Sequence, residues 1–167
     1  MTALGSATPD SELDDPAKEL LWGRPGFLVR RLHQIHVALF FEECKGMNIT
    51  PVQYAILTTL SVMPGLDQTA LAQEVGLDRT NTADVVKRLE THELLYRQPD
   101  PNDRRTRNVF LTQQGKDAVV LMHESMARAQ ERMLQPLRPA QKKQFMGLLA
   151  ILVESNNQYS RTVLRGL

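Results

Sequence analysis

The stretch that decides the fold runs from Asp67 to Gly115 and reads DQTALAQEVGLDRTNTADVVKRLETHELLYRQPDPNDRRTRNVFLTQQG. Asp67 can cap a helix over residues 68–75, because its carboxylate can accept hydrogen bonds from the free N–H groups of a first helical turn. Gly76 then allows the left-handed backbone that ends a helix. A second helix is predicted over residues 79–91, so the stretch opens with two short helices and a tight turn.

Two β-prone runs follow these helices. Residues 94–98 and 107–111 flank a loop, residues 99–106, that is dense in Asp and Arg. Thr112 can cap the next helix. The stretch therefore predicts a helix-turn-helix with a β-hairpin wing, within a fold that is mainly α with a small β-wing.

Longer helices are predicted before the stretch. Proline suits a first helical turn, and from Pro25 to near Gly46 apolar residues recur with helical spacing at Leu28, Leu32, Ile35 and Leu39. A second helix is expected to begin at Thr50-Pro51 and to stop before Pro64-Gly65.

Two more helices are predicted after it. One runs from Thr112 to about Leu134, and the last starts near Ala140 with a strong amphipathic pattern at Phe145, Leu148, Leu149, Leu152 and Val153. These apolar stripes at the two ends of the chain are wider than a small head needs to cover. They predict a two-fold homodimer built from the terminal helices.

The predicted organisation has four parts. Residues 1–18 form a flexible acidic arm, 19–48 an N-terminal dimerisation helix, 49–112 the winged helix-turn-helix region, and 113–167 the C-terminal dimerisation helices. The 167 residues suit one compact domain or a small head merged with an oligomerisation region.

Charge is unevenly distributed in a chain whose net charge is only +1. Residues 1–19 hold five acids and one lysine, whereas residues 79–107 hold seven bases and five acids. A nucleic-acid partner would thus be attracted by this local basic segment. The single cysteine, and the absence of a signal-peptide pattern or a long apolar run, predict a cytoplasmic protein without a membrane partner.

The motifs resemble those of the MarR family of transcription regulators, which are winged-helix homodimers. The wing run from Asp100 to Gly115, DPNDRRTRNVFLTQQG, is similar to the family's signature of spaced Asp and Arg followed by Leu-Thr-x-x-Gly. Leu71-Ala72, Val75-Gly76-Leu77, Val85 and Arg88-Leu89-Glu90 match its two-helix pattern. The resemblance covers about residues 25–159.

Two positions depart from that pattern. Asn102 stands where the family often has Arg, so the number of basic residues at the wing tip differs. The family commonly has a glycine after the second helix, where this chain has Thr91-His92-Glu93-Leu94. A left-handed non-glycine residue there would cost on the order of 1 kcal/mol.

The second helix and the wing supply the predicted contacts with double-stranded DNA. An α-helix fits the major groove, and polar residues near its N-terminus reach base edges. The candidates for base contacts are Thr80, Asn81, Thr82 and Asp84, and those for phosphate contacts are Arg79, Lys87 and Arg88. In the wing, Arg104, Arg105 and Arg107 are expected to enter the minor groove or neutralise phosphates, with Asp103 holding one arginine in place.

The resemblance also implies a repressor that is released from a pseudo-palindromic operator by a small molecule. The run PGFLVRRLHQIH at residues 25–36 looks like that of family members governing aromatic-acid catabolism, some of which sense a CoA thioester. An anionic effector would find polar groups on Arg30, Arg31, His33 and His36 and apolar walls on Phe27, Tyr54 and Met122.

Other functions are weighed on the same residues. Cys44 could serve a redox-responsive regulator, although Glu42 and Glu43 disfavour its thiolate. A winged helix could also bind a protein instead of DNA. No catalytic residue, metal site or cofactor is predicted, because no nucleophile elbow, phosphate loop or metal motif occurs.

Overall fold

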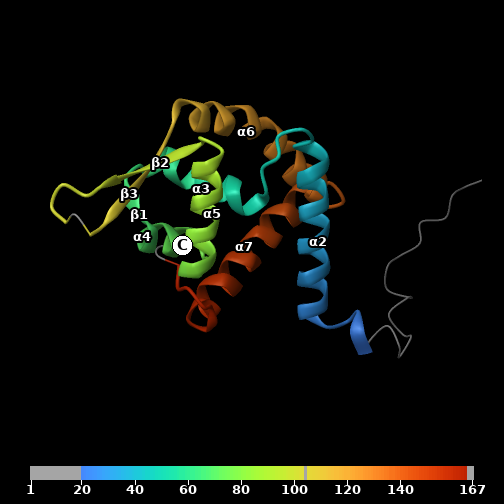
Figure 1. Cartoon of the computed structure of the whole chain (residues 1–167). Coiled ribbons are helices and arrows are strands. Elements are labelled where there is room, and N and C mark those ends of the chain that lie inside the picture. The colour runs from blue at the N-terminus through green and yellow to red at the C-terminus, as the bar shows by residue number, and fades with distance from the viewer. Residues whose placement is uncertain (1–19, 104, 165–167) are drawn as a thin grey trace, which may run out of the picture. The chain divides into compact units, whose positions relative to one another are not determined.

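The computed structural model describes residues 20–103 and 105–164 (Figure 1). The chain divides into two compact units, Met1–Ala38 and Leu39–Leu167. The boundary falls within α2 (Pro25–Glu43), the long helix predicted from Pro25. The predicted acidic arm, residues 1–18, lies outside the described residues.

The second unit contains the winged helix-turn-helix, and the mainly helical fold with a small sheet is confirmed. Its elements are α3 (Pro51–Val62), β1 (Leu66–Asp67), α4 (Gln68–Val75), α5 (Arg79–Thr91), β2 (Leu95–Pro99), β3 (Arg107–Leu111), α6 (Gln113–Leu134), α7 (Pro139–Asn156) and the 3₁₀ turn η2 (Asn157–Tyr159). The helix bounds lie within three residues of those predicted, with α2 ending at Glu43 and not near Gly46. The short elements β1 and η2 were not predicted.

A three-stranded antiparallel sheet has the strand order β1-β3-β2. In β2 and β3, Leu95 pairs with Leu111 and Pro99 pairs with Arg107, so the hairpin is in register from its base to its loop. The added strand β1 pairs Leu66 with Val109. Because α4 begins directly after β1, this pairing places the start of α4 beside β3.

One hydrophobic core lies under the helix-turn-helix. It is made by side chains that are almost fully buried and that come from the end of α2, from α3 to α6 and from the sheet: Phe40, Ile56, Leu57, Leu60, Leu71, Val86, Leu89, Leu95, Val109 and Met122. Burial of a large apolar side chain stabilises a fold by about 1.5–3 kcal/mol. This core therefore holds the two short helices and the wing in one rigid head.

Thr112 joins the exit of the wing to the end of α5. Its Oγ1 accepts a hydrogen bond from Gly115 N at 3.0 Å and donates one to Glu93 O at 2.6 Å. Glu93 has φ +57°, so the backbone is left-handed at the position where the family commonly has glycine. This conformation is strained for a non-glycine residue. The strain expected from the sequence is thus present at Glu93.

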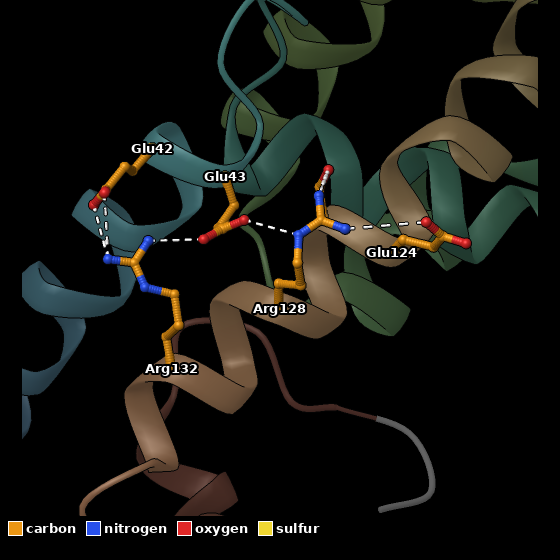
Figure 2. A network of polar contacts seen from close by, with 6 residues as sticks. Glu42, Glu43, Glu124, Arg128 and Arg132 are labelled. Carbon is orange, nitrogen blue, oxygen red and sulfur yellow. Dashed lines mark hydrogen bonds and ion pairs between the residues drawn. The ribbon is translucent and has the colours of Figure 1, made fainter.

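The C-terminal end of α2 is attached to α6 by ion pairs (Figure 2). Glu43 accepts hydrogen bonds from Arg128 Nε at 2.9 Å and from Arg132 at 2.7 Å, and Arg132 also reaches Glu42. The hydrogen bonds from Arg132 and Arg128 lower the pKa of the Glu43 carboxyl. Both arginines are about half exposed, so solvent and salt screen the network.

The last helix, α7, contains no buried residue. Its exposed side chains include a row of large apolar residues, Met146, Leu148, Ile151, Leu152 and Val153. Large exposed apolar surfaces mark sites of association. In the part of the chain that the structure describes, no helix is both long and apolar enough to cross a bilayer.

Candidate DNA-binding interface

The helix-turn-helix is fixed by two aspartate caps. Asp67 Oδ1 accepts from Thr69 N at 2.7 Å and from Ala70 N at 2.9 Å, as predicted. Asp78 caps α5 by accepting from Asn81 N at 2.9 Å, a role that the sequence analysis missed. An aspartate directly before a polar helix is a typical cap signal and could have identified it. Between the caps, Gly76 has φ +70° and ends α4.

One face of α5 is buried and the other is free. Val86 and Leu89 point into the core and are fully buried. Of the residues of this helix that were predicted to contact DNA, all but Thr82 are exposed: Arg79, Thr80, Asn81, Asp84, Lys87 and Arg88. The exposed set runs along the whole length of the helix. It forms a continuous polar surface that bears three positive charges and one negative charge.

Thr82 corrects the prediction for this helix. Its side chain is fully buried, and its Oγ1 donates a hydrogen bond to Asp78 O at 2.9 Å. Thr82 lies four residues before Val86 and therefore shares the core-facing stripe of the helix. Residue type alone suggests that Thr82 lies on the polar face, but its position along the helix decides its direction.

Asn81 is exposed but already has a partner. Its side-chain Nδ2 donates to the carboxylate of Asp78, whose other oxygen caps the helix. The amide oxygen of Asn81 remains available as an acceptor. Bidentate recognition of adenine needs the amide oxygen and one N–H of the amide nitrogen, and Asn81 keeps a second N–H beside the one that it donates to Asp78.

The wing loop is shaped by two aspartates. Asp100 accepts from Asn102 N at 2.8 Å and from Asn108 Nδ2 at 2.9 Å, and hydrogen bonds led by that of Asn102 lower its pKa. Asp103 accepts from the backbone N of Arg105 at 2.9 Å and from the hydroxyl of Thr106 at 3.0 Å. These bonds fix the loop backbone on both sides of its tip.

Asp103, predicted to hold one of the wing arginines in place, bonds the backbone of Arg105. Its described partners are the backbone N of Arg105 and a hydroxyl, and not the side chain of Arg105 or Arg107. It places Arg105 through the backbone and leaves the guanidinium exposed to solvent. Arg107 is also exposed, while Arg104 lies outside the described residues.

A cleft of about 220 Å³ lies between the helix-turn-helix and the wing. Four arginines line it: Arg79, Arg97, Arg105 and Arg107. The other lining residues are Asp67, Gln68, Thr69 and Thr106. The structure thus brings a predicted residue of α5 together with two predicted residues of the wing. With four arginines and one aspartate in its lining, the cleft has an excess of positive charge, which raises the local concentration of anionic partners.

Arg97 in this cleft was missed by the sequence analysis. It lies in β2 opposite Val109, and its guanidinium forms a bidentate ion pair with Glu90 of α5. This pairing raises the pKa of Arg97, so the side chain stays charged. Its place beside the other arginines follows from the register of β2 on β3, which residue types alone do not fix.

Three of the five predicted effector residues of the first unit line a hollow of about 460 Å³. Phe27, Arg30 and Arg31 line it with Trp22, and the Arg30 guanidinium lies 5.3 Å from the centre of the Phe27 ring. His33 is exposed, whereas burial and the charge of His33 lower the pKa of His36, which is partly buried.

The other two predicted effector residues, Tyr54 and Met122, belong to the second unit and do not line the same hollow. Tyr54 is partly buried against Phe40, with ring centres 6.3 Å apart. Met122 is fully buried and borders a hollow of about 470 Å³ with Leu89 of α5 and with His92, the residue that follows α5. Tyr54 does not line this hollow. Gln53 of α3 and Gln114 of α6 also line that hollow.

Comparisons with known proteins agree with this architecture. A model of the MarR family matches residues 49–106. The chain is 26% identical to the transcriptional repressor NicR of Pseudomonas putida over 89% of this chain and 94% of the relative.

Two solved structures are similar over most of their length. The PcaV regulator of Streptomyces coelicolor, solved with its natural ligand, is 35% identical with a TM-score of 0.75, covering 80% of this chain and 94% of that one. BpsR of Bordetella bronchiseptica, whose DNA binding is regulated by 6-hydroxynicotinic acid, is 28% identical with a TM-score of 0.72, covering 76% and 96%. The chain therefore belongs to the MarR family and is a transcriptional regulator, not an enzyme.

Proposed function

We propose that this regulator is a homodimeric repressor that binds a pseudo-palindromic DNA operator and is released from it by a small anionic ligand. One observation carries the DNA-binding part of the proposal. The exposed polar face of α5 adjoins a cleft in which Arg79, Arg97, Arg105 and Arg107 converge. Such a surface matches a duplex, which offers base edges in its groove and phosphates on either side.

In the proposed complex α5 lies in the major groove. Thr80, Asn81 and Asp84 are exposed near its N-terminal end, where side chains of such helices reach base edges. Arg79, Lys87 and Arg88 contact phosphates. Thr82 has no part in base recognition, because it is buried.

The wing extends away from the helices (Figure 1) and bears Arg105 and Arg107. An arginine that enters a narrow minor groove gains from the enhanced negative potential there. Arg105 is best placed for this role, because Asp103 fixes its backbone and leaves its guanidinium free. Arg107 lies at the start of β3 and faces the phosphates.

The terminal helices provide the dimer interface in this proposal. Every residue of α7 is at least partly accessible in the single chain, although the helix has many apolar residues. Leu28 and Ile35 of α2 are exposed as well. Pairing of such surfaces in a two-fold dimer would present two heads, and we expect half-sites about one helical turn, roughly 10 bp, apart.

An aromatic acid or its CoA thioester is the proposed class of effector. Arg30 and Arg31 offer guanidinium groups beside the aromatic rings of Phe27 and Trp22. A guanidinium suits a carboxylate, and aromatic rings suit a planar ligand. The likeness to BpsR, which responds to 6-hydroxynicotinic acid, supports this class. His33 and His36 lie on the same helix and could contribute further polar contacts.

Redox sensing through Cys44 is less well supported. Cys44 is buried, and burial together with the charge of Glu43 raises the pKa of its thiol. A sensing cysteine needs the thiolate and access to the oxidant. A protein-binding winged helix is the other alternative, and it would lack the steep salt dependence of a DNA complex.

The test is selection of duplexes from a random-sequence pool by the full chain, followed by binding at several salt concentrations. We expect a two-fold related sequence and an affinity that falls steeply with salt. A regulator that selects no duplex at low salt would contradict the proposal. Thermal shift with aromatic acids and their CoA thioesters tests the effector, since a ligand that binds only the folded state raises its stability.

A further inference from the structure

The chain beyond α7 returns to the turn of the helix-turn-helix. Thr162 Oγ1 donates a hydrogen bond to Leu77 O at 2.8 Å, across 85 residues of sequence. Leu164 lies against the preceding residue of the turn, because a Cβ built on Gly76 would come 3.1 Å from Leu164 Cδ2. Figure 1 shows this red segment beside α4 and the start of α5.

Residues 157–164, here called the C-terminal clasp, have a defined conformation. The side chain of Asn157 bonds the backbone of Leu164 twice, with Leu164 N donating to Oδ1 at 3.0 Å and Nδ2 donating to Leu164 O at 3.0 Å. Ser160 N donates to Asn157 O at 3.1 Å. The clasp is therefore a closed loop at the end of α7.

The clasp holds the Leu77 peptide, which lies at the N-terminal end of α5. The carbonyl of Leu77 directly precedes Asp78, the residue that caps α5. On its other side, Leu77 N donates to Ala72 O at 3.0 Å and so is tied to α4. A restraint on the Leu77 peptide limits how the N-terminal end of α5 can rotate relative to α4 and to α7.

We propose that the C-terminal clasp positions the recognition helix α5 relative to α7 and thereby sets the half-site spacing that the dimer accepts. Thr162, Leu164 and Asn157 are positioning residues and do not contact DNA themselves. The inference rests on the proposed function, in which α5 reads DNA and α7 joins the two copies. In this proposal the turn at Leu77 and the C-terminal clasp move together, although they are far apart in the sequence.

Hydrogen exchange of the free, full-length protein is the first test, because it needs no DNA. Thr162→Val removes the hydroxyl and nearly keeps the volume, whereas Thr162→Ser keeps the hydroxyl. We expect Thr162→Val to speed exchange at the amides of residues 76–82 by about three- to tenfold, the effect of one lost hydrogen bond. Thr162→Ser should exchange like the wild type, and amides in β2 and β3 should not change in either variant.

Spacing discrimination is the second test. A duplex selected by the wild-type chain is compared with versions in which one base pair is inserted or removed between the half-sites. We expect Thr162→Val and Asn157→Ala to bind the selected duplex about three- to tenfold more weakly and to discriminate less between spacings. Thr162→Ser should behave as the wild type.

The two measurements separate the possible failures. Unchanged exchange at residues 76–82 in Thr162→Val overturns the clasp. A lower melting temperature with unchanged spacing discrimination would show that the clasp only stabilises the fold, which also overturns the proposal. If the wild-type chain selects no duplex, the proposed DNA binding fails, while the exchange data still decide whether the clasp restrains the turn.

Discussion

Gly115 lies directly beneath the carbonyl of Leu94, so closely that a Cβ on Gly115 would sit 1.9 Å from Leu94 O. The contact joins the first turn of α6 to the segment between α5 and β2. Thr112 N donates to the same Leu94 oxygen at 3.1 Å. The Leu-Thr-x-x-Gly sequence at the base of the wing is therefore a packing requirement, in which Thr112 makes the hydrogen bonds and Gly115 leaves the room.

Gly115→Ala should destabilise the protein by about 1–3 kcal/mol or more, because backbone and not a flexible side chain must move to admit the methyl group. Urea unfolding measures the loss. Gly26→Ala is the matched control, since a Cβ there meets nothing within 4 Å. An unchanged midpoint for Gly115→Ala would contradict the close approach.

Glu93→Gly should stabilise the protein. Glu93 has φ +57°, a conformation that costs a non-glycine residue about 1–2 kcal/mol. Part of this gain is offset because glycine has more freedom in the unfolded chain, so the net gain expected is about 1 kcal/mol or less. Glu93→Ala keeps the strain and should not stabilise, which separates the backbone effect from loss of the carboxylate.

The ion pairs of Glu43 should make stability sensitive to acid. The pKa of Glu43 is lower in the folded state, owing to hydrogen bonds from Arg132 and Arg128. The contribution is therefore complete above the unfolded pKa and is lost as pH falls through the folded value. The difference in unfolding free energy between wild type and Glu43→Gln should be constant near neutral pH and shrink below pH of about 4.3, the ordinary value for glutamate.

Glu124→Gln is the control for that measurement. Its carboxylate lies 4.0 Å from Arg128 and is highly exposed, so the pair contributes little. Its removal should leave the acid dependence of stability close to that of the wild type. An acid profile that is the same in Glu43→Gln and the wild type would contradict the assigned role of Glu43.

The sequence predicted most of the head because its helix ends carry chemical signals. Asp67, Thr112 and Gly76 mark helix ends through their own hydrogen bonds or backbone freedom. By contrast, β1 has only two residues, too few to show a period of two. The clasp was not predicted because its contacts join residues 85 positions apart.

The candidate site was predicted less completely for a related reason. Residue type identified the basic residues of the wing and α5, but it did not show which way each one faces. Thr82 turned out to face the core, and Arg97 joined the cleft through strand register. Both outcomes depend on three-dimensional neighbours that one sequence does not specify.

Arg105→Ala should weaken binding to every duplex variant by a similar factor. Its exposed guanidinium is placed to meet the DNA backbone or minor groove, and loss of one phosphate contact lowers the salt slope by about one. Lys143→Ala, an exposed charge on α7, is the control for a change in net charge. An Arg105→Ala variant with wild-type affinity and slope would exclude the wing tip from the interface.

Asn81→Ala and Thr82→Val should separate the exposed and buried faces of α5. Asn81 is exposed, so its loss should change preference at one base position by about 1–3 kcal/mol. Thr82→Val keeps the volume of a fully buried side chain and removes its hydrogen bond to Asp78 O. It should lower stability by about 0.5–1.5 kcal/mol and leave base preference unchanged. Selection from a random-sequence pool with each variant measures both, and an altered base preference in Thr82→Val would mean that this helix meets DNA with a different face.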